Sequence, residues 1–180
     1  MPTTAHTYTL GPDDAQLTVR TGRSGAAAKA GHNLLIEVSS WEATLALGDD
    51  ATETALTVSV DSSSLRVLDG TGGMQALGDD DKANIEQTIV DEVLKGSAIE
   101  FRSSHVQMEN GVCHIQGELE LADKRAPLAF DLTLGDDRHL AGTVTVKQSD
   151  WGMKPYSALF GTLKVNDEVA VQIDGQLPAA

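Results

Sequence analysis

The chain has 180 residues, with 13 Lys and Arg against 27 Asp and Glu, so its formal net charge is −14. A surface of this charge repels phosphate backbones, which excludes nucleic acid as an expected partner. The only cysteine, Cys113, excludes an intramolecular disulfide and a Cys-based zinc cluster. The length favours one domain over residues 1–180, and 41% hydrophobic residues supply it with a core.

The opening residues Met1–Leu10 contain neither a basic segment nor the apolar run of roughly 7–15 residues that a secretory signal needs. No segment approaches the roughly 20 apolar residues of a transmembrane helix. We therefore expect a cytoplasmic protein without stable insertion into a membrane.

Alternation of apolar and polar residues is the main structural signal, and it predicts antiparallel strands with one solvated face. Ala15–Thr21 is the first clear example. Asn33–Leu47 contains no Gly or Pro, and it predicts one strand of roughly 50 Å. Its apolar phase changes from even to odd positions, so we predict a β-bulge near Ser39-Ser40.

One helix is predicted after a further alternating strand at 56–60. Asp80 or Asp81 can cap its N-terminus, and apolar residues recur every four positions from Ile85 to Val93. Gly96 supplies a C-terminal stop.

The second half of the chain contains three hairpin signals between alternating strands. Asn110-Gly111 predicts a tight turn, and Ala122–Lys124 and Gly135–Asp137 predict two further hairpin loops. Pro127 is expected to open or edge its strand.

The pattern amounts to about eight antiparallel strands, with the helix between the third and the fourth. We expect a mainly-β fold, an extended eight-stranded antiparallel β-barrel with one inserted α-helix. A sandwich is the alternative, but closure removes exposed edges and the long strand favours a barrel. A barrel of this size either is filled by side chains or holds one small ligand.

Little in the sequence predicts catalysis. There is no P-loop, no HExxH motif and no Gly-x-Ser-x-Gly elbow, and the five histidines lack metal-ligand spacing. His32 has two interpretations: a polar group at the barrel mouth that contacts a ligand or a carboxylate, or a ring that ties the strand end to loop backbone. Cys113 falls on the apolar face of its alternating strand and is expected to pack in the core. We expect no catalytic residue, no metal and no cofactor.

The apolar residues suggest a binding site instead. Seven aromatic residues and small aliphatic ones would leave part of a long barrel unfilled, which suits a long hydrocarbon chain. Ordinary core packing is the alternative for each single residue. The candidate ligand-binding residues are His32, Leu34, Ile36, Trp41, Phe101, Ile115, Phe130, Trp151, Tyr156, Phe160 and Val171.

Six short stretches occur in order along nearly the whole chain. They are residues 30–33 (AGHN) before a strand with Trp41, residues 56–65 (LTVSVDSSSL), the helix at 81–96 followed by 99–101 (IEF), residues 117–121 (GELEL) with Pro127, residues 150–152 (DWG) and residues 167–169 (DEV). Together they resemble the YceI-like family of lipocalin-like, polyisoprenoid-binding proteins. The resemblance implies an eight-stranded lipocalin-like barrel whose apolar pore binds a long isoprenoid without catalysis. Many members of that family carry a signal peptide and are exported.

Three hypotheses for function follow. The first is non-enzymatic binding, storage or transport of a polyisoprenoid or isoprenoid quinone in the barrel pore. The second is an enzyme acting on a lipid-like substrate, with His32 as acid or base and a loop carboxylate as its partner. The third is a module whose acidic face docks a membrane-bound redox partner. The expected partner is a long-chain isoprenoid or other lipid, and a homodimer is left open.

Overall fold

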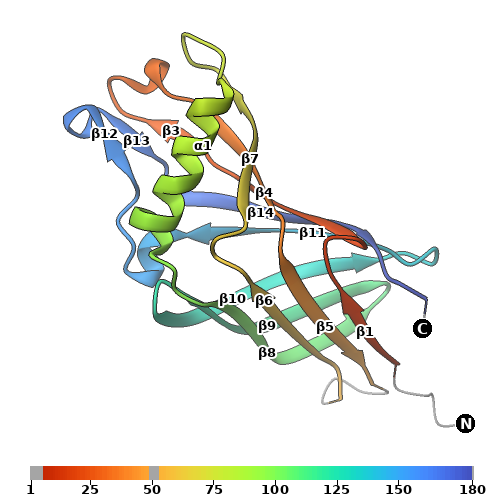
Figure 1. The fold of residues 1–180 in the computed structure, drawn as a ribbon. Helices are drawn as coiled ribbons and strands as arrows, with labels where there is room; N and C mark the ends of the chain where they lie inside the picture. Colours follow the sequence, from red (N-terminus) through yellow and green to blue (C-terminus); the bar gives the residue numbers. More distant parts are fainter. Residues whose placement is uncertain (1–5, 49–52, 180) are drawn as a thin grey trace, which may run out of the picture.

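The computed structural model describes residues 6–48 and 53–179, so the first residues of the N-terminal segment lie outside the described part. The fold is mainly β with one α-helix (Figure 1). The strands are β1 (His6–Leu10), β2 (Ala15–Arg20), β3 (Arg23–Ser24), β4 (Asn33–Val38), β5 (Trp41–Leu47), β6 (Ala55–Val60), β7 (Leu65–Thr71), β8 (Ile99–Glu109), β9 (Val112–Leu121), β10 (Lys124–Leu134), β11 (His139–Lys147), β12 (Ser157–Ala158), β13 (Leu163–Val165) and β14 (Glu168–Gln176). The helical segments are α1 (Asp79–Thr88), the π-helical turn η2 (Ile89–Leu94) and the 3-10 turns η1 (Ala28–Ala30), η3 (Gln148–Trp151) and η4 (Leu159–Gly161).

One antiparallel sheet has the strand order β1-β5-β6-β8-β9-β10-β11-β14-β2-β4-β7. The strand β4 pairs with β2 and β7, whereas β5, which follows it directly, pairs with β1 and β6. One chain segment therefore contributes β5 next to one end of this order and β4 next to the other end, which curls the sheet into a ring. If β4–β5 and β6–β7 each count as one bent strand, the ring has eight strands within the described residues: β2, β4–β5, β6–β7, β8, β9, β10, β11 and β14. The predicted antiparallel barrel, with its helix between the third and fourth strands, is confirmed.

The stretch Asn33–Leu47 is not one continuous strand with a bulge but two strands joined by a bend, so the predicted β-bulge near Ser39-Ser40 was wrong. The strands β4 and β5 are separate on either side of Ser39-Ser40, and the main chain of these serines is hydrogen-bonded to the β6–β7 turn. The change of apolar phase marks a bend at which the chain changes neighbours. The register shift in β4 lies earlier, between Leu35 and Ile36 against β7.

The helix lies along β7 and covers one side of the barrel (Figure 1). Its N-cap is Gly78 rather than an aspartate, and the Asp81 carboxylate accepts a hydrogen bond from the Gly78 N–H at 3.0 Å. The Glu86 carboxylate accepts one from the Val67 N–H at 2.9 Å, which attaches the helix to β7. The helical segment ends before Gly96, whose φ of 66° is a left-handed conformation that glycine adopts without strain.

The three predicted hairpins connect β8 to β11. Asn110 and Gly111 have φ of 52° and 78°, and Ala122 and Asp123 have φ of 51° and 62°, as two-residue hairpin turns require. Pro127 lies inside β10 rather than at its start, but β10 is paired there with β9 and not with β11. A proline is tolerated on such an open side because no ladder bond is lost.

Buried apolar side chains form two clusters. The first centres on the strands β1, β5, β8 and β9, and contains Trp41, Phe101 and Ile115. The second forms where η2 and η3 meet β9 and β11, and contains Leu94 and Trp151. Leu65, Leu119 and Leu128 pack against both clusters, so the two make one continuous apolar interior.

Candidate functional site

An apolar cavity of about 350 Å³ lies inside the barrel. Inward-facing residues of the strands and one face of α1 and η2 line it. Among the described residues, its wall contains no Asp, Glu, Lys, Arg or His, and its polar members are three threonines, Gln148 and Tyr156. This volume and the few polar groups in the wall are typical of small-molecule sites. The cavity therefore has no group that could hold a charged ligand by ion pairing.

The alternation of the strands explains why the wall is apolar. Leu56, Val58 and Val60 of β6 point inward, whereas Thr57 and Ser59 are exposed on the outer face. Val58 is itself only half-buried although it faces the interior. The space in front of such side chains is not filled by the opposite wall, which is how a cavity of this size persists.

The barrel wall is incomplete between β10 and β11, and other elements cover the gap. These strands pair only where 132–134 meets 140–142, and they diverge beyond that point. The η3 turn packs against β10, and the Trp151 Nε1 donates a hydrogen bond to the Leu119 carbonyl oxygen at 2.8 Å. Ile85 and Ile89 of the helical segment line the interior. The η3 turn therefore covers part of the gap beside β10, and the helix completes the wall beside β7.

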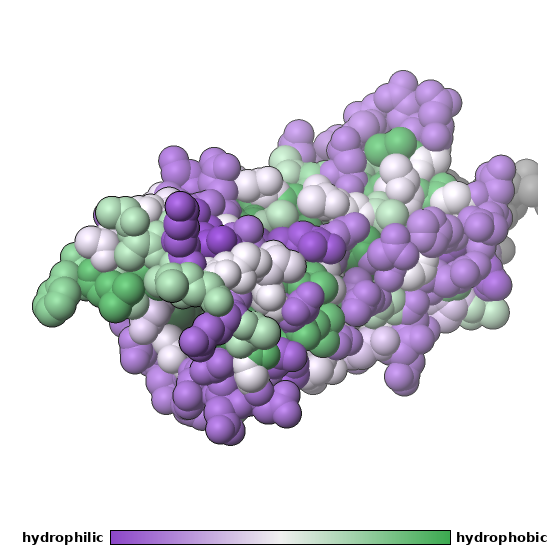
Figure 2. Space-filling view, turned by 90° about the horizontal axis from the view of Figure 1, so that it is seen from above, coloured by the Kyte–Doolittle hydropathy of each residue, from purple (hydrophilic) through white to green (hydrophobic). Residues whose placement is uncertain are grey.

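A second, more open depression adjoins the cavity where the loop 72–78 meets α1 and the segment before β12. Ile85, Thr88 and Tyr156 line both the cavity and this depression. Figure 2 views the molecule from this end and shows hydrophobic residues gathered at the left, over β12 and β13. The shared residues make this end the path between the interior and solvent.

The structure brings most of the predicted ligand-binding residues together around the cavity. The rings of Phe101 and Phe130 pack with their centroids 5.1 Å apart at an interplanar angle of 57°. Tyr156 stands at the mouth, 40% exposed. The predicted residues that line the cavity are Leu34, Ile36, Trp41, Phe101, Phe130, Tyr156 and Val171.

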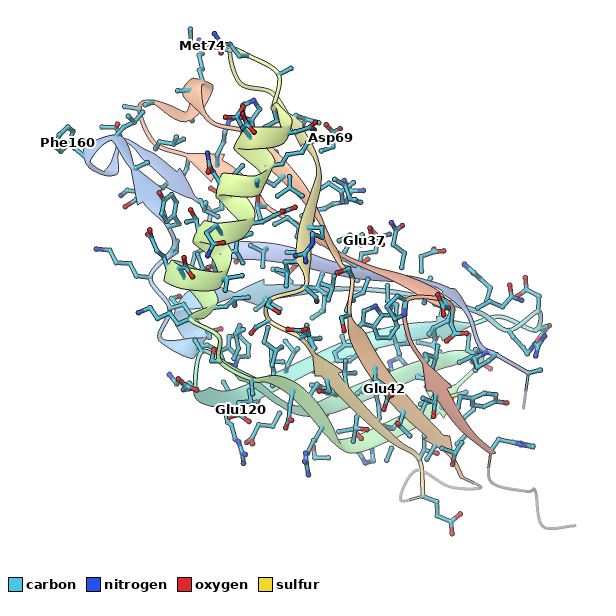
Figure 3. The ribbon with its side chains drawn as sticks, in the orientation of Figure 1. Glu37, Glu42, Asp69, Met74, Glu120 and Phe160 are labelled. Atoms are coloured by element: carbon cyan, nitrogen blue, oxygen red, sulfur yellow. The ribbon has the colours of Figure 1, made fainter. Side chains whose placement is uncertain are left out.

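Four predicted residues do not line this cavity. Ile115 and Trp151 are buried in the two core clusters, 1% and 3% exposed, and pack behind the wall. Phe160 is fully exposed and points away from the barrel (Figure 3). Phe160 was predicted to bind ligand, but left-handed backbone at Leu159 and Phe160 turns the tip outward. His32 lines only the outer depression.

The His32 ring binds backbone. Its Nε2 lies 2.6 Å from the Gln75 carbonyl oxygen, which ties the start of β4 to the loop 72–78. No carboxylate of the described residues is hydrogen-bonded to it. This contact agrees with the interpretation in which the His32 ring ties the strand end to loop backbone. It supplies no acid–base pair for the enzyme hypothesis.

The Trp41 indole has an unusual environment. The side chain is 6% exposed and lines the cavity, yet its Nε1 is buried without a hydrogen-bond partner among the described residues. A buried donor without a partner costs roughly 1–3 kcal/mol. The alternation of apolar and polar residues correctly placed Trp41 inside the barrel. It carries no information on whether the indole N–H has a hydrogen-bond partner.

The helical segment also lines the cavity, although no residue of it was among the predicted ligand-binding residues. Ile85, Ile89, Val93 and Leu94 all line the cavity. Their stripe at helical spacing was visible in the sequence, but an apolar stripe predicts only a buried face. Which interior that face meets depends on the placement of the helix across the barrel.

The remaining reactive groups lie outside the cavity wall. Cys113 is buried, and desolvation raises the pKa of its thiol, as expected of a packing residue. His105 and His114 are exposed, and His114 Nδ1 lies 2.7 Å from an Asp131 carboxylate oxygen. Over 6–48 and 53–179, no group of three or more His, Cys, Asp or Glu is arranged to hold a metal ion. No helix in these ranges is long and apolar enough to span a bilayer.

Residues 8–177 match the YceI-like domain family. The chain belongs to this family. The fold agrees with two solved structures at low sequence identity. BcnA of Burkholderia cenocepacia is 12% identical, with a TM-score of 0.64 over 92% of this chain and 96% of BcnA. The YCEI protein of Campylobacter jejuni is 13% identical, with a TM-score of 0.54 over 81% and 85% of the two chains.

A mutant of the YCEI protein, described as holding a monobromobimane guest, is 12% identical to this chain with a TM-score of 0.56 over 81% and 85% of the two chains. No curated protein matches the sequence significantly. At such identities these solved structures support the fold alone. Ligand and pathway therefore have to be argued from the cavity itself.

Proposed function

We propose that the protein binds a long apolar lipid, a polyisoprenoid or an isoprenoid quinone, inside the barrel and stores or carries it without chemical change. One observation carries this proposal: a cavity of about 350 Å³ whose described wall has no charged side chain. A hydrocarbon chain gains free energy when it leaves water, at roughly 25 cal/mol per Å² of buried apolar surface. Membership of the YceI-like family supports the isoprenoid class.

The same wall argues against catalysis on the bound chain. General acid–base chemistry needs a titratable group within hydrogen-bond reach of the reacting atoms. The described wall has no carboxylate, imidazole or amine; the phenol of Tyr156 lies at its mouth, and His32, in the adjoining depression, binds loop backbone. We therefore assign binding rather than turnover to this cavity.

The experiment has two parts. Purified protein is extracted with organic solvent and the extract is analysed by mass spectrometry, in which an isoprenoid stoichiometric with protein is expected. Lipid-stripped protein is then titrated with a long-chain isoprenoid quinone, and the fluorescence of Trp41 in the wall and the buried Trp151 is followed.

A matched pair of variants tests the location of binding. Val58→Phe adds a ring inside the cavity, where the half-buried Val58 leaves room, whereas Thr57→Phe adds the same ring to the outer face of β6. We expect Val58→Phe to weaken binding by about tenfold or more and Thr57→Phe to leave it unchanged. Equal binding by the two variants, with unchanged circular dichroism, would contradict the proposal, as would failure of stripped wild-type protein to bind.

A further inference from the structure

An apolar tip projects from the end of the molecule at which the cavity opens. It consists of Leu159 and Phe160 in the η4 turn between β12 and β13, and we call it the apolar tip. Leu159 is 53% exposed and Phe160 is fully exposed. Figure 3 shows Phe160 at the same end as Met74, far from Glu42 and Glu120. Large apolar side chains this exposed are expected at a contact surface.

The backbone holds the apolar tip outward. Leu159 and Phe160 have φ of 52° and 57°, a conformation that non-glycine residues rarely adopt in succession. The Leu159 carbonyl oxygen accepts hydrogen bonds from the Thr162 hydroxyl at 2.6 Å and from the Thr162 N–H at 3.2 Å. The Thr162 carbonyl oxygen in turn accepts one from the Ala27 N–H at 2.8 Å. The tip is therefore a fixed turn attached to the neighbouring chain segment.

The charge around the apolar tip is opposite to that of the protein as a whole. The segments 15–36 and 151–166, which pair through β3 and β13, contain no Asp or Glu in a chain that has 27. Lys29, Lys154 and Lys164 are exposed in these segments, and none forms an ion pair with a described residue. In a protein of net charge −14, the segments that carry and support the apolar tip are thus basic and apolar, whereas the N-terminus of α1 at the same end is acidic.

Met74 lies at the same end but in a different setting. It is 83% exposed, and its loop leads into the three aspartates at the N-terminus of α1, Asp79, Asp80 and Asp81. An anionic surface would be repelled there. Because the aspartates lie near Met74 and the lysines lie near the apolar tip, an anionic surface is expected to contact Leu159 and Phe160 rather than Met74.

The apolar tip is connected directly to the cavity. Tyr156, just before β12, lines both the cavity and the outer depression, and Val165 of β13 lines the cavity. The hairpin that bears the tip therefore has its base in the cavity wall. A surface bound to the tip would lie close to the opening through which a lipid enters or leaves.

We propose that this end of the protein docks on an anionic phospholipid membrane, with Leu159 and Phe160 in the boundary between headgroups and acyl chains and Lys29, Lys154 and Lys164 facing lipid phosphates. Apolar insertion combined with basic residues is the usual physical basis of peripheral membrane binding. The proposal rests on the proposed function, because it assigns the membrane as the place where the barrel takes up or releases its lipid.

The test is co-sedimentation of the full chain with phosphatidylcholine vesicles that contain or lack phosphatidylglycerol. The variants are Phe160→Asn, chosen because asparagine tolerates left-handed backbone, and the double variant Lys154→Glu/Lys164→Glu. Leu68→Asn removes another exposed leucine, 38% exposed on β7, and is the control. We expect wild type and Leu68→Asn to bind only the anionic vesicles, Phe160→Asn to bind about tenfold less, and added salt or the charge reversal to weaken binding.

Absence of binding to anionic vesicles, or equal binding by Phe160→Asn and wild type, would overturn the docking proposal. So would a dimer in sedimentation experiments that Phe160→Asn converts to a monomer, because the tip would then be covered by a second copy. Lipid extraction separates this proposal from the function itself. If isoprenoid is recovered from protein that does not bind vesicles, the docking proposal alone is refuted. If the protein binds vesicles but holds no isoprenoid, the proposed lipid-binding function is refuted.

Discussion

The Trp151 indole N–H donates a hydrogen bond to the Leu119 carbonyl oxygen at 2.8 Å, whereas the Trp41 indole N–H has no partner within the described residues. Both side chains are nearly completely buried, at 3% and 6% exposed. One indole joins η3 to β9 and closes the barrel wall. The other contributes only its apolar surface to the cavity and leaves a buried donor unpaired.

This contrast predicts different costs for the same substitution. Trp151→Phe removes a buried hydrogen bond, whereas Trp41→Phe removes a donor that is unpaired. In urea unfolding of lipid-free protein, we expect Trp151→Phe to lower the free energy of unfolding by about 1–3 kcal/mol more than Trp41→Phe. Equal m-values serve as the control for two-state unfolding, and a larger loss for Trp41→Phe would contradict the prediction.

Asp167 predicts a defined dependence of stability on acid pH. The hydrogen bond from the Ser149 hydroxyl, helped by the Ser149 N–H and the Lys147 charge, outweighs desolvation and holds the pKa of Asp167 below its ordinary value of 3.8. The folded state thus favours the ionised carboxylate. Its contribution to stability is present above about pH 4 and is lost as the pH falls through the lower folded pKa.

Ser149→Ala tests this relationship. We expect the pKa of Asp167, followed by the ¹³C shift of its carboxyl group, to rise toward 3.8. Ser157→Ala is the control, because Ser157 is exposed and is not among the groups that shift the pKa of Asp167. An unchanged pKa of Asp167 in Ser149→Ala would show that the hydroxyl does not set it.

Cys113 is predicted to be inert in the folded protein. It is 1% exposed, desolvation raises the pKa of its thiol, and the thiolate is the reactive form. We expect a thiol reagent at pH 8 to label Cys113 only after denaturant is added. Gln107→Cys in a Cys113→Ala background places a thiol on the exposed face of β8 and should react at once. Rapid labelling of native wild type would contradict the burial.

Gly117 tests how tightly β8 and β9 approach each other. A Cβ at this position would lie 2.6 Å from the Phe101 ring and 2.8 Å from the Ser103 Cα, beside the register shift in β8. We expect Gly117→Ala to lower the free energy of unfolding by about 1–3 kcal/mol. Gly78→Ala, whose nearest heavy atom is 3.6 Å away, should cost less than about 1 kcal/mol. Similar midpoints in thermal unfolding of the two variants would refute the close approach.

The sequence by itself determined the class of fold and much of the cavity wall. Alternation along β6 and β10 fixes which side chains face inward, because successive residues of a strand point to opposite faces. That rule placed Phe101, Phe130 and Val171 at the interior without knowledge of their neighbours. The helix was found in the same way, from a stripe that repeats about every four residues.

Only the tertiary structure decided what those residues meet. The bend at Ser39-Ser40 depends on which strands pair with β4 and β5, and the backbone contact of His32 depends on a loop more than forty positions away. The outward turn of Phe160 depends on left-handed backbone. Periodicity reports the local direction of a side chain, whereas pairing, hydrogen bonding and exposure arise between segments distant in the chain. For that reason the inward faces were predictable, and the mouth of the barrel was not.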